Sequence, residues 1–516
     1  MNSMIDIRRY MDNALKGLVL LLASLFFAGA AEAEHPAGRG GRINVTIFND
    51  IGGFDHIEAP HAGLSRLQVL FAVHDRLFEP DAGTGKPVPR LALKAVPRDD
   101  FTNWRVWLRP GVQFSNGEKL TADAYQRHFE RLLKSEYARR FRALAGAPLR
   151  KVTASGKLTI DFQFSKPNPG FRAAMSHGGA YIWFLNAPNL MTRNQAHPSL
   201  SGMSAGAGPY RIAAWERGKR IVLKRNPGYW DPAAQHADEI HYHILGGYNA
   251  EDLLQWLRGG QLDAAAVIAD SVIRAARKQR DLRVFRAVRD HFGLAVGFNQ
   301  QFAPLGDQVA RLALVQAIDR RAIARALGSG EADIADQLFA AVRWRCEDVG
   351  YPAHDPGGAR NILDALGADF SQLQIWADDT PPMRRAVGVP TGVHLVTAAD
   401  HSLTYQIVTG RAAVWIWQQG PFVHPSFSDL SLRSASRQNI SRLRSAKIDA
   451  AIAGLARARS KKDIGAAHCA FEAVKSELVP YLPVMRGVLG MITRKDIGGV
   501  RLTGDPVLGY HRLFRK

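Results

Sequence analysis

The sequence predicts an α/β protein that folds as more than one lobe, and three observations support this. The chain has 516 residues, whereas a single hydrophobic core stops growing at roughly 250–300 residues. Segments that alternate apolar and polar residues, as strands do, are interspersed with segments of helical spacing. Hydrophobic residues make up 46% of the chain and charged residues 22%, a composition typical of globular proteins. We therefore expect several mixed sheets covered by helices.

The first half of the chain is expected to begin with a strand over residues 42–48. Leucines and other apolar residues at helical spacing predict a helix over 63–77. Residues 104–108 alternate and end at an Arg-Pro-Gly turn, so they are expected to form a strand. A threonine in the N-cap position begins the next predicted helix, over 121–133. Residues 158–164 alternate again and predict another strand.

The second half continues the mixture of strands and helices. Strands are expected over 220–225 and 239–244, followed by a helix over 250–258 that ends at a Gly-Gly pair. Residues 309–326 have the spacing of one long amphipathic helix. Shorter helices are expected over 359–366, 446–458 and 463–478, and prolines then return the chain to a strand over 484–493.

The N-terminus has the pattern of a secretory signal peptide. Basic residues around Arg8 and Arg9 precede an apolar run over 17–28, which is shorter than the ~20 residues of a membrane span. An Ala-Glu-Ala sequence at 31–33 supplies the small residues that precede a cleavage site. We expect a signal peptide over 1–33, removed on export to the periplasm; an uncleaved membrane anchor is the alternative.

The chain carries a formal net charge of +20. Such a charge favours anionic partners or surfaces, although a diffusely basic surface without a dedicated partner is an alternative interpretation. The sequence has no basic-aromatic cluster, zinc knuckle or recognition-helix pattern, so we do not expect nucleic-acid binding.

The two cysteines, Cys346 and Cys469, leave two alternatives open. In an oxidising compartment they could form one disulfide. Their distance in the sequence does not decide the question, and two buried free thiols are the other possibility. Neither lies in a metal-ligand or Cys-x-x-Cys pattern.

A stretch near the middle of the chain resembles the signature of a known family. Residues 205–211 form a Gly-rich turn that leads into a strand, and residues 221–230 end in Asn-Pro-Gly-Tyr-Trp. The glycines permit tight turns, and Asn-Pro-Gly is a second turn signal. The stretch is similar to the dipeptide-, oligopeptide- and nickel-type binding proteins of ABC importers, the extracellular solute-binding proteins of family 5.

Further blocks agree with this family and occur in the family's order. They are Phe54-Asp55 in place of an early Leu-Asp-Pro turn, 73–77, 108–118, 120–123, 259–263, 298–299 with 304–305, 311–323 and 351–363. Most of these residues are expected in turns, caps and core positions, so they indicate the fold more than the ligand.

The resemblance implies a two-lobed periplasmic-binding-protein fold of the large peptide-binding type, with two hinge strands. Lobe one would take residues 42–285, with an extra subdomain at about 60–180, and lobe two residues 286–486. Residues 487–516 would return to lobe one. The implied function is that of a monomeric periplasmic protein that captures peptides or a peptide-sized solute for the permease of an ABC transporter in the inner membrane, without a cofactor and without catalysis.

The resemblance also places the ligand segment at residues 414–425. Peptide-binding members use an aspartate after a Gly-Trp pair to bind the α-ammonium of the peptide, but Gln419 and Gly420 stand near its place here. Loss of this charge-assisted hydrogen bond would cost roughly 1.5–3 kcal/mol. The sequence therefore argues against peptides with a free amine, while peptide-like ligands remain allowed.

The candidate ligand-binding residues combine aromatic and neutral polar side chains. Trp415 and Trp417 lie two apart on a predicted strand, and we expect one to face the ligand cleft and the other the core; two core tryptophans are the alternative. Gln418, Gln419 and His424 offer neutral hydrogen bonds. The full set is Phe54, Asp55, Trp415, Trp417, Gln418, Gln419, Gly420 and His424.

One further acidic pair has two interpretations. Asp378 and Asp379 precede a short predicted helix over 383–387. They would either cap this helix or meet a cationic group of the ligand.

Two competing functions have partial sequence support. Residues 202–206 match the Gly-x-Ser-x-Gly pattern of serine hydrolases, with Ser204 as the nucleophile, but no apolar strand leads into them. His241 and His243 lie on one face of a strand and could chelate a metal or belong to a haem or metal carrier, although we expect them on a solvated strand edge. A sensor of the same fold without a transport partner is a third alternative.

Overall fold

The computed structural model describes about seven-tenths of the chain. The described residues are 40–48, 50–51, 53–54, 64–81, 86–134, 148–176, 184–188, 190, 204–245, 250–267, 270–286, 292–327, 334–337, 346–347, 349–369, 373–378, 393–396, 403–419, 432–436, 439–458, 460–487, 490–501 and 509–516. The expected signal peptide and the expected helix over 383–387 lie outside these residues.

The first large sheet has seven strands and mixed direction. Its order is β12-β18-β11-β1-β10-β9-β8, and β1 pairs in parallel with both β10 and β11, while the other pairs are antiparallel. The strands are β1 (Arg42–Ile47), β8 (Tyr210–Glu216), β9 (Arg220–Arg225), β10 (Glu239–Ile244), β11 (Ala264–Val267), β12 (Leu282–Arg286) and β18 (Gly490–Arg494).

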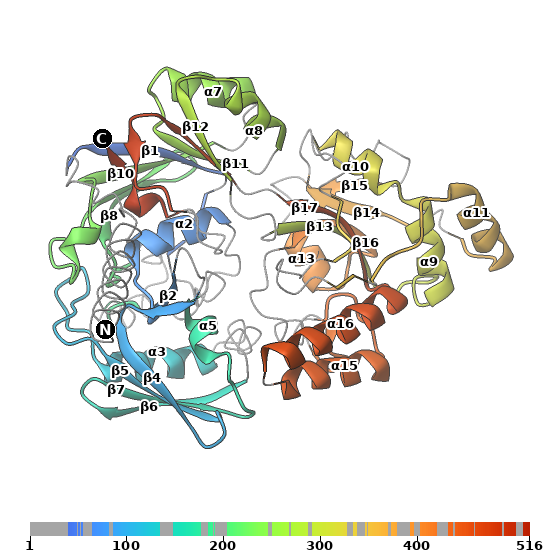
Figure 1. Ribbon diagram of the computed structural model, residues 1–516, viewed down its shortest axis with the longest axis horizontal. Helices are drawn as coiled ribbons and strands as arrows, with labels where there is room; N and C mark the ends of the chain where they lie inside the picture. Colours follow the sequence, from blue (N-terminus) through green and yellow to red (C-terminus); the bar gives the residue numbers. More distant parts are fainter. Residues whose placement is uncertain are drawn as a thin grey trace, which may run out of the picture. The chain divides into compact units, whose positions relative to one another are not determined.

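Helices pack against both faces of this sheet (Figure 1). Helix α2 (Leu64–Val73) shares a hydrophobic core with β1, whose Ile43, Val45 and Ile47 are buried. Helices α7 (Ala250–Arg258) and α8 (Asp270–Arg277) form a second core with β11, β12 and β18. The burial follows the amphipathic pattern of each helix.

A four-stranded antiparallel sheet forms a separate layer in the first half of the chain. Its order is β4-β5-β7-β6, and helix α3 (Ala122–Lys134) covers one face. On β5 the side chains of Trp104, Val106 and Leu108 are buried, while the intervening ones are partly exposed, as expected for strands with one solvated face. The strands are β4 (Ala92–Arg98), β5 (Asn103–Leu108), β6 (Leu149–Gly156) and β7 (Thr159–Phe164), and the neighbouring short elements are β2 (Phe78–Pro80), β3 (Pro87–Pro89), α5 (Phe171–Ser176) and η4 (Pro232–Ala234).

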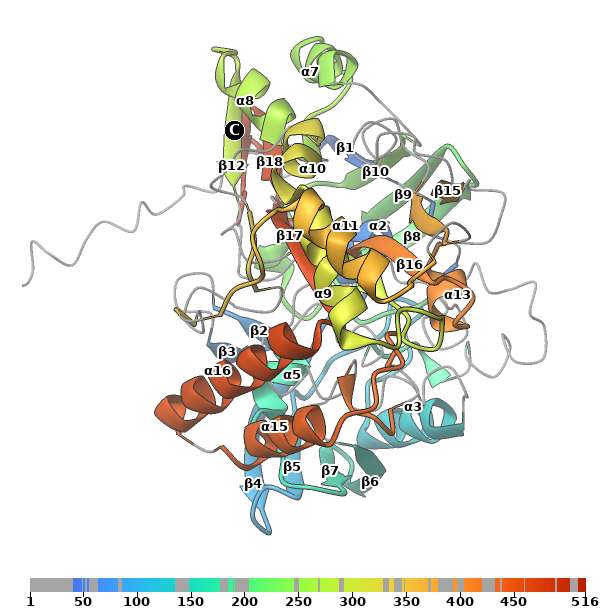
Figure 2. The ribbon, with the colours of Figure 1, turned by 90° about the vertical axis from the view of Figure 1, so that its right-hand side faces the viewer.

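The second large sheet has five strands in the order β15-β14-β16-β13-β17. One face packs against α13, α15 and α16, which lie together in one core, and the other face packs against α9 and α10 in another core. Figures 1 and 2 show α15 and α16 side by side, and α11 next to α9. The elements are β13 (Phe292–Phe298), β14 (Ile375–Asp378), β15 (Val393–Val396), β16 (Val414–Gln419), β17 (Tyr481–Gly487), α9 (Gln308–Ala317), α10 (Arg320–Ala326), α11 (Pro356–Ala365), α13 (Leu403–Val408), α15 (Ala446–Arg457) and α16 (Lys461–Leu478).

The chain passes between the two large sheets twice. It leaves the first sheet at the end of β12 and enters the second at β13, and it returns from β17 to β18. The C-terminal elements η8 (Tyr510–Arg512), β19 (Ile497–Gly498) and β20 (Phe514–Arg515) belong with the first sheet, because the Tyr510 hydroxyl donates to the Thr46 carbonyl and Arg515 binds Asp263. The predicted α/β fold with several mixed sheets is confirmed.

Two predicted elements are each divided in the structure. The helix expected over 309–326 is broken into α9 and α10 because Ile318 is extended and Asp319 caps a new helix, its carboxylate accepting from the Ala322 amide. The strand expected over 484–493 is two strands, β17 and β18, in different sheets. Both errors have the same cause: apolar periodicity continues across a local break in the backbone.

Candidate functional site

The two candidate tryptophans lie on β16, an interior strand of the second large sheet. Trp415 is 1% exposed, and its ring centroid is 6.4 Å from that of Tyr481. Gly297 lies opposite Trp415 on β13, where a Cβ would overlap the indole. Trp417 is only partly buried and packs on the same core.

The two tryptophans lie on the same side of the sheet. Side chains two residues apart on a strand point to the same face, and here that face is the one that packs against α15 and α16. Ile416, between them, belongs to the core on the other face. Trp417 thus has surface to offer a ligand, whereas Trp415 is a core residue.

The other candidate residues are only partly covered by the structure. Phe54 is fully buried and its ring meets that of Trp215 edge-on at 5.4 Å. Asp50 fastens the same loop, since it accepts from Trp215 Nε1 at 2.9 Å and from the Gly218 amide at 2.8 Å. Phe54 therefore packs the loop after β1 against β8 and β9. Three candidates lie outside the described residues: Asp55, Gly420 and His424. The side chains of Gln418 and Gln419 are not described either. Of the acidic pair, Asp378 ends β14 and Asp379 is not described.

The Gly-rich turn of the signature sits against the end of α2. The Gly208 amide donates to the Val73 carbonyl at 2.9 Å. A Cβ at Gly208 would lie 2.5 Å from the Val73 carbonyl carbon, and one at Gly206 would overlap the same carbonyl. The side-chain amide of Asn226 donates to the Gly208 carbonyl at 2.9 Å and holds the turn from the other side. Glycine is required here because two backbone segments approach closely.

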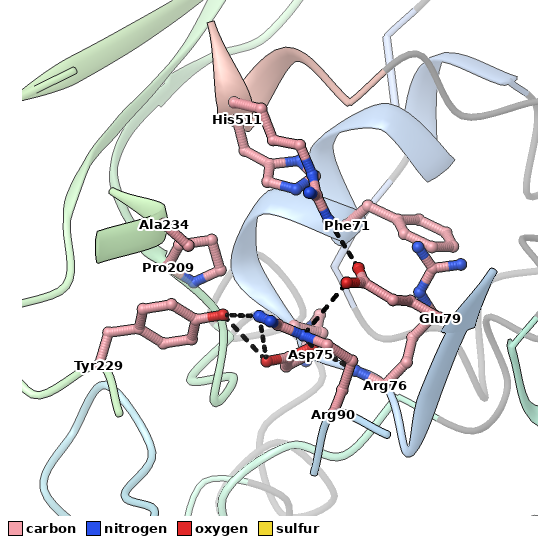
Figure 3. A pocket seen from close by; sticks show the side chains of 11 residues that line it. Phe71, Asp75, Arg76, Glu79, Arg90, Pro209, Tyr229, Ala234 and His511 are labelled. Carbon is pink, nitrogen blue, oxygen red and sulfur yellow. Dashed lines mark hydrogen bonds and ion pairs between the residues drawn. The ribbon is translucent and has the colours of Figure 1, made fainter. Parts of the chain in front are cut away.

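The second half of the signature converges on Asp75, which directly follows this contact (Figure 3). Its Oδ2 accepts from the Tyr229 hydroxyl at 2.9 Å and from the Arg90 guanidinium at 3.2 Å. It also accepts from Trp230 Nε1 at 3.0 Å. Arg90 also binds Asp231 at 3.1 Å. Burial, reinforced by the charge of Asp75, holds the pKa of Tyr229 well above its usual value. Asp75 is therefore the centre of a hydrogen-bond network that joins segments about 150 residues apart in the sequence.

A small pocket lies beside this network (Figure 3). Its volume is about 20 Å³, which is room for one water molecule, whereas ligand pockets measure roughly 300–1,000 Å³. Arg512 donates to Glu79 at 2.6 Å on its wall and ties the C-terminal η8 to β2. The lining residues are Phe71, His74, Asp75, Arg76, Glu79, Arg90, Pro209, Tyr229, Ala234, His511 and Arg512. This pocket is part of the scaffold and is too small for a peptide.

Ser204 does contact a histidine. Its hydroxyl lies 3.1 Å from His74 Nε2 and donates to Asn186 Oδ1 at 2.6 Å, and His74 Nδ1 lies 3.1 Å from the Leu185 carbonyl. Burial lowers the pKa of His74 to about 3, so the imidazole is a poor general base at neutral pH. Its ring also stacks on Phe184. These contacts hold the segment that precedes the Gly-rich turn against the end of α2.

The histidine pair expected on a solvated strand edge lies elsewhere. Strand β10 is bonded to β1 on one side and to β9 on the other, and His241 is 7% exposed. His241 Nε2 pairs with Glu239 at 2.8 Å, and His243 Nε2 with the Asn44 side chain at 3.2 Å. The prediction of an edge strand is wrong because hydrophobic alternation does not report which strands become neighbours. No group of three or more potential ligands for a metal occurs among the described residues.

Cys346 and Cys469 form a disulfide that spans 123 residues, with their Cα atoms 5.4 Å apart. The side chain of Gln337 bonds both the amide and the carbonyl of Cys346, at 3.1 and 2.6 Å. The bridge attaches this segment to α16.

Sequence reasoning missed a buried ion pair on the same helix. Lys475 donates to Glu472 in a short hydrogen bond, and both side chains are 0% exposed. Opposite charges three apart on a helix are usual on the surface, so their spacing does not indicate burial. Within the described ranges, no helix is long and apolar enough to cross a membrane.

Comparison with known proteins places the chain in a family. The model of bacterial extracellular solute-binding proteins, family 5 (middle region), matches residues 86–387, more than half of the chain. The protein belongs to this family. Its curated relatives include the probable di/tripeptide-binding protein 5 of Pseudomonas aeruginosa, 27% identical over 58% of this chain and 60% of the relative. Another is the peptide transport periplasmic protein SapA of Salmonella typhimurium, 24% identical over 59% of this chain and 58% of the relative. The matched part thus spans about three-fifths of these relatives.

Solved structures support the fold over a greater length. The family 5 protein resembles the periplasmic binding protein DppA of Helicobacter pylori in complex with the peptide STSA, with a TM-score of 0.81 at 16% identity. The likeness covers 93% of this chain and 98% of the other. A dipeptide-binding protein of a Pseudoalteromonas species in complex with Met-Leu gives a TM-score of 0.80 at 17% identity, over 92% of this chain and 100% of the other. The chain therefore has the periplasmic-binding-protein fold of the large peptide-binding type.

Proposed function

We propose that the protein is the solute-capturing component of an ABC import system, which binds peptides or a peptide-sized solute and delivers them unchanged to a permease in the inner membrane. The observation that carries the proposal is family membership over residues 86–387, together with the backbone likeness to peptide-bound binding proteins. We further propose that it acts in the periplasm as a monomer, after export through the signal peptide at residues 1–33.

The division into lobes gives this function a mechanism. We propose that residues 42–285 and 487–516 form lobe one and residues 286–486 form lobe two, because each contains its own large sheet and the chain passes between the sheets twice. Two connecting segments permit a hinge motion. A ligand that contacts both lobes favours the closed state by its additional affinity for that state, and the closed state is the one presented to the permease.

The ligand is proposed to be a peptide or a peptide-like molecule without a strict need for a free amine. The relatives include a probable di/tripeptide-binding protein, and the similar structures include one in complex with a nine-residue peptide and one in complex with agropinic acid. Gln419 and Gly420 stand where a peptide-binding member carries its aspartate, and a neutral side chain cannot compensate a buried ammonium. Trp417, which is partly exposed, is proposed to contact the ligand through its ring.

We propose that no catalysis accompanies binding. Support comes from the Ser204 site, where the only histidine at hydrogen-bond distance among the described residues has a pKa near 3. An activated-serine probe such as a fluorophosphonate should leave Ser204 unlabelled, and labelling that disappears in Ser204→Ala would overturn this part of the proposal.

Isothermal titration with paired ligands tests the function. Di- to pentapeptides are compared with their N-acetylated forms and with opines, using mature protein freed of co-purified ligand by partial unfolding and refolding. We expect saturable 1:1 binding in which acetylation changes the dissociation constant less than tenfold. Trp417→Ala should weaken binding, whereas Trp107→Ala, a partly buried tryptophan on β5, should not. Failure of every peptide and opine to bind would refute the ligand class, and a loss of more than a hundredfold on acetylation would refute the tolerance of a blocked amine.

A further inference from the structure

The buried face of α16 carries a row of ionisable side chains. His468, Glu472 and Lys475 are spaced four and three residues apart, so they lie on one face of the helix. All three are 0% exposed. Lys475 donates to Glu472 Oε2, but this bond uses only one of the two carboxylate oxygens.

Several polar atoms at this face have no hydrogen-bond partner among the residues that the structure describes. They are both ring nitrogens of His468, Oε1 of Glu472 and the hydroxyl of Tyr351. Buried polar atoms of native proteins are almost always bonded either to protein groups or to ordered water. Four unpartnered atoms on three neighbouring side chains therefore need an explanation.

The three side chains act on each other electrostatically. Burial and then the carboxylate of Glu472 raise the pKa of Tyr351, while burial lowers the pKa of His468 against the opposing effect of Glu472. Arg320 and Asp336, which bind each other at 3.2 Å, face Tyr351 from the side of α10. Glu472 therefore interacts with both His468 and Tyr351, and the unpartnered atoms of these three side chains lie around its carboxylate.

The disulfide joins the two segments that carry these side chains. Cys469 directly follows His468 on α16, and Cys346 precedes Tyr351 by five residues. Gln337 holds the backbone of Cys346 through two hydrogen bonds. The covalent bond thus fixes the chain that leads to Tyr351 against the polar face of α16.

We propose that His468, Glu472 and Tyr351 enclose ordered water molecules, and that the Cys346–Cys469 disulfide keeps this hydrated compartment closed. The chemistry of the atoms favours water as the occupant. A neutral imidazole offers one donor and one acceptor, the tyrosine hydroxyl offers a donor, and the carboxylate oxygen only accepts. Water both donates and accepts, so it can bridge all three, and a buried water commonly makes about three such bonds.

A crystal structure of the oxidised protein at about 1.5 Å resolution tests the first half of the proposal. We expect water density within 3.2 Å of the His468 ring nitrogens, Glu472 Oε1 and the Tyr351 hydroxyl. In the structure of Tyr351→Phe, one of these waters should be absent or displaced. A compartment without water, in which rearranged side chains bond each other directly, overturns the proposal.

Hydrogen exchange tests the role of the disulfide. The wild type is compared before and after reduction, alongside the Cys346→Ala/Cys469→Ala double variant. We expect amides in the middle of α16 to exchange at least tenfold faster without the disulfide, while those of α3 in the four-stranded sheet keep their rate. The reduced wild type serves as the measurement if the double variant does not fold. Unchanged exchange in α16, or equal acceleration in α3, would show that the disulfide does not close this compartment.

Discussion

Removing the carboxylate of Asp75 is expected to be one of the most damaging single changes in the part of the chain that the structure describes. Asp75→Ala takes the acceptor from the Tyr229 hydroxyl and from Trp230 Nε1, and it removes an ionic partner from Arg90. A buried donor left without a partner costs about 1–3 kcal/mol. Arg90 still pairs with Asp231 at 3.1 Å, so losing its pair with Asp75 should add only about 1 kcal/mol to the cost. The two donors and the weakened ion pair together give an expected loss of unfolding free energy of about 3–7 kcal/mol.

Urea unfolding followed by tryptophan fluorescence measures this loss, and Asp231→Ala is its matched control. Asp231 binds the same arginine at a similar distance, but its side chain is 28% exposed, against 9% for Asp75. Because water and ions screen an exposed pair, the control should cost under about 1 kcal/mol. Equal losses in Asp75→Ala and Asp231→Ala would refute the reasoning, since they would show that the tyrosine and tryptophan donors do not depend on Asp75.

Three further predictions concern stability. Burial lowers the pKa of His74 from 6.5 to about 3, so below pH 6.5 the unfolded chain binds a proton that the folded chain does not. About 2 kcal/mol of unfolding free energy should therefore be lost between pH 6.5 and 5. If His74→Gln loses as much stability over this pH range as the wild type, the prediction is wrong. Gly208→Ala should lower the unfolding free energy, measured by chemical denaturation, by about 1–3 kcal/mol or more because the new Cβ would overlap the backbone. Gly454→Ala, whose Cβ would enter open space on α15, should raise it by about 0.5–1 kcal/mol. Similar effects of the two substitutions would refute the packing argument. Lys475→Met should lower the unfolding free energy by about 3–5 kcal/mol because it leaves the Glu472 carboxylate buried without its cation, whereas the double variant Lys475→Met/Glu472→Met should lose far less. If a double-mutant cycle shows that the two single effects add, the two side chains are not a coupled pair.

Local sequence signals predicted much of the fold, because turns and strands depend on neighbouring residues. The Gly-rich turn at residues 205–209 and the Asn-Pro-Gly turn were recognisable from composition alone. Their role was not, since Asp75 and its partner Tyr229 are 154 residues apart. A hydrogen bond of that separation leaves no local pattern in a single sequence.

The features that the sequence did not predict have simple physical origins. Trp415 and Trp417 share a face because a strand has a period of two, and their common face became core where α15 and α16 cover it. The break between α9 and α10 depends on Asp319, whose capping role was hidden inside a continuous apolar pattern. The buried Lys475–Glu472 pair has the spacing of a surface pair, and only the packed structure shows that solvent is excluded from it.

Native mass spectrometry of the mature protein, purified gently from the periplasm of an expressing cell, measures whether a solute is captured and left intact. We expect one small molecule of peptide size per chain, released with an unaltered mass after prolonged incubation with the protein. A molecule that is cleaved or attached covalently during that incubation would contradict the claim that the protein binds its solute and leaves it chemically unchanged.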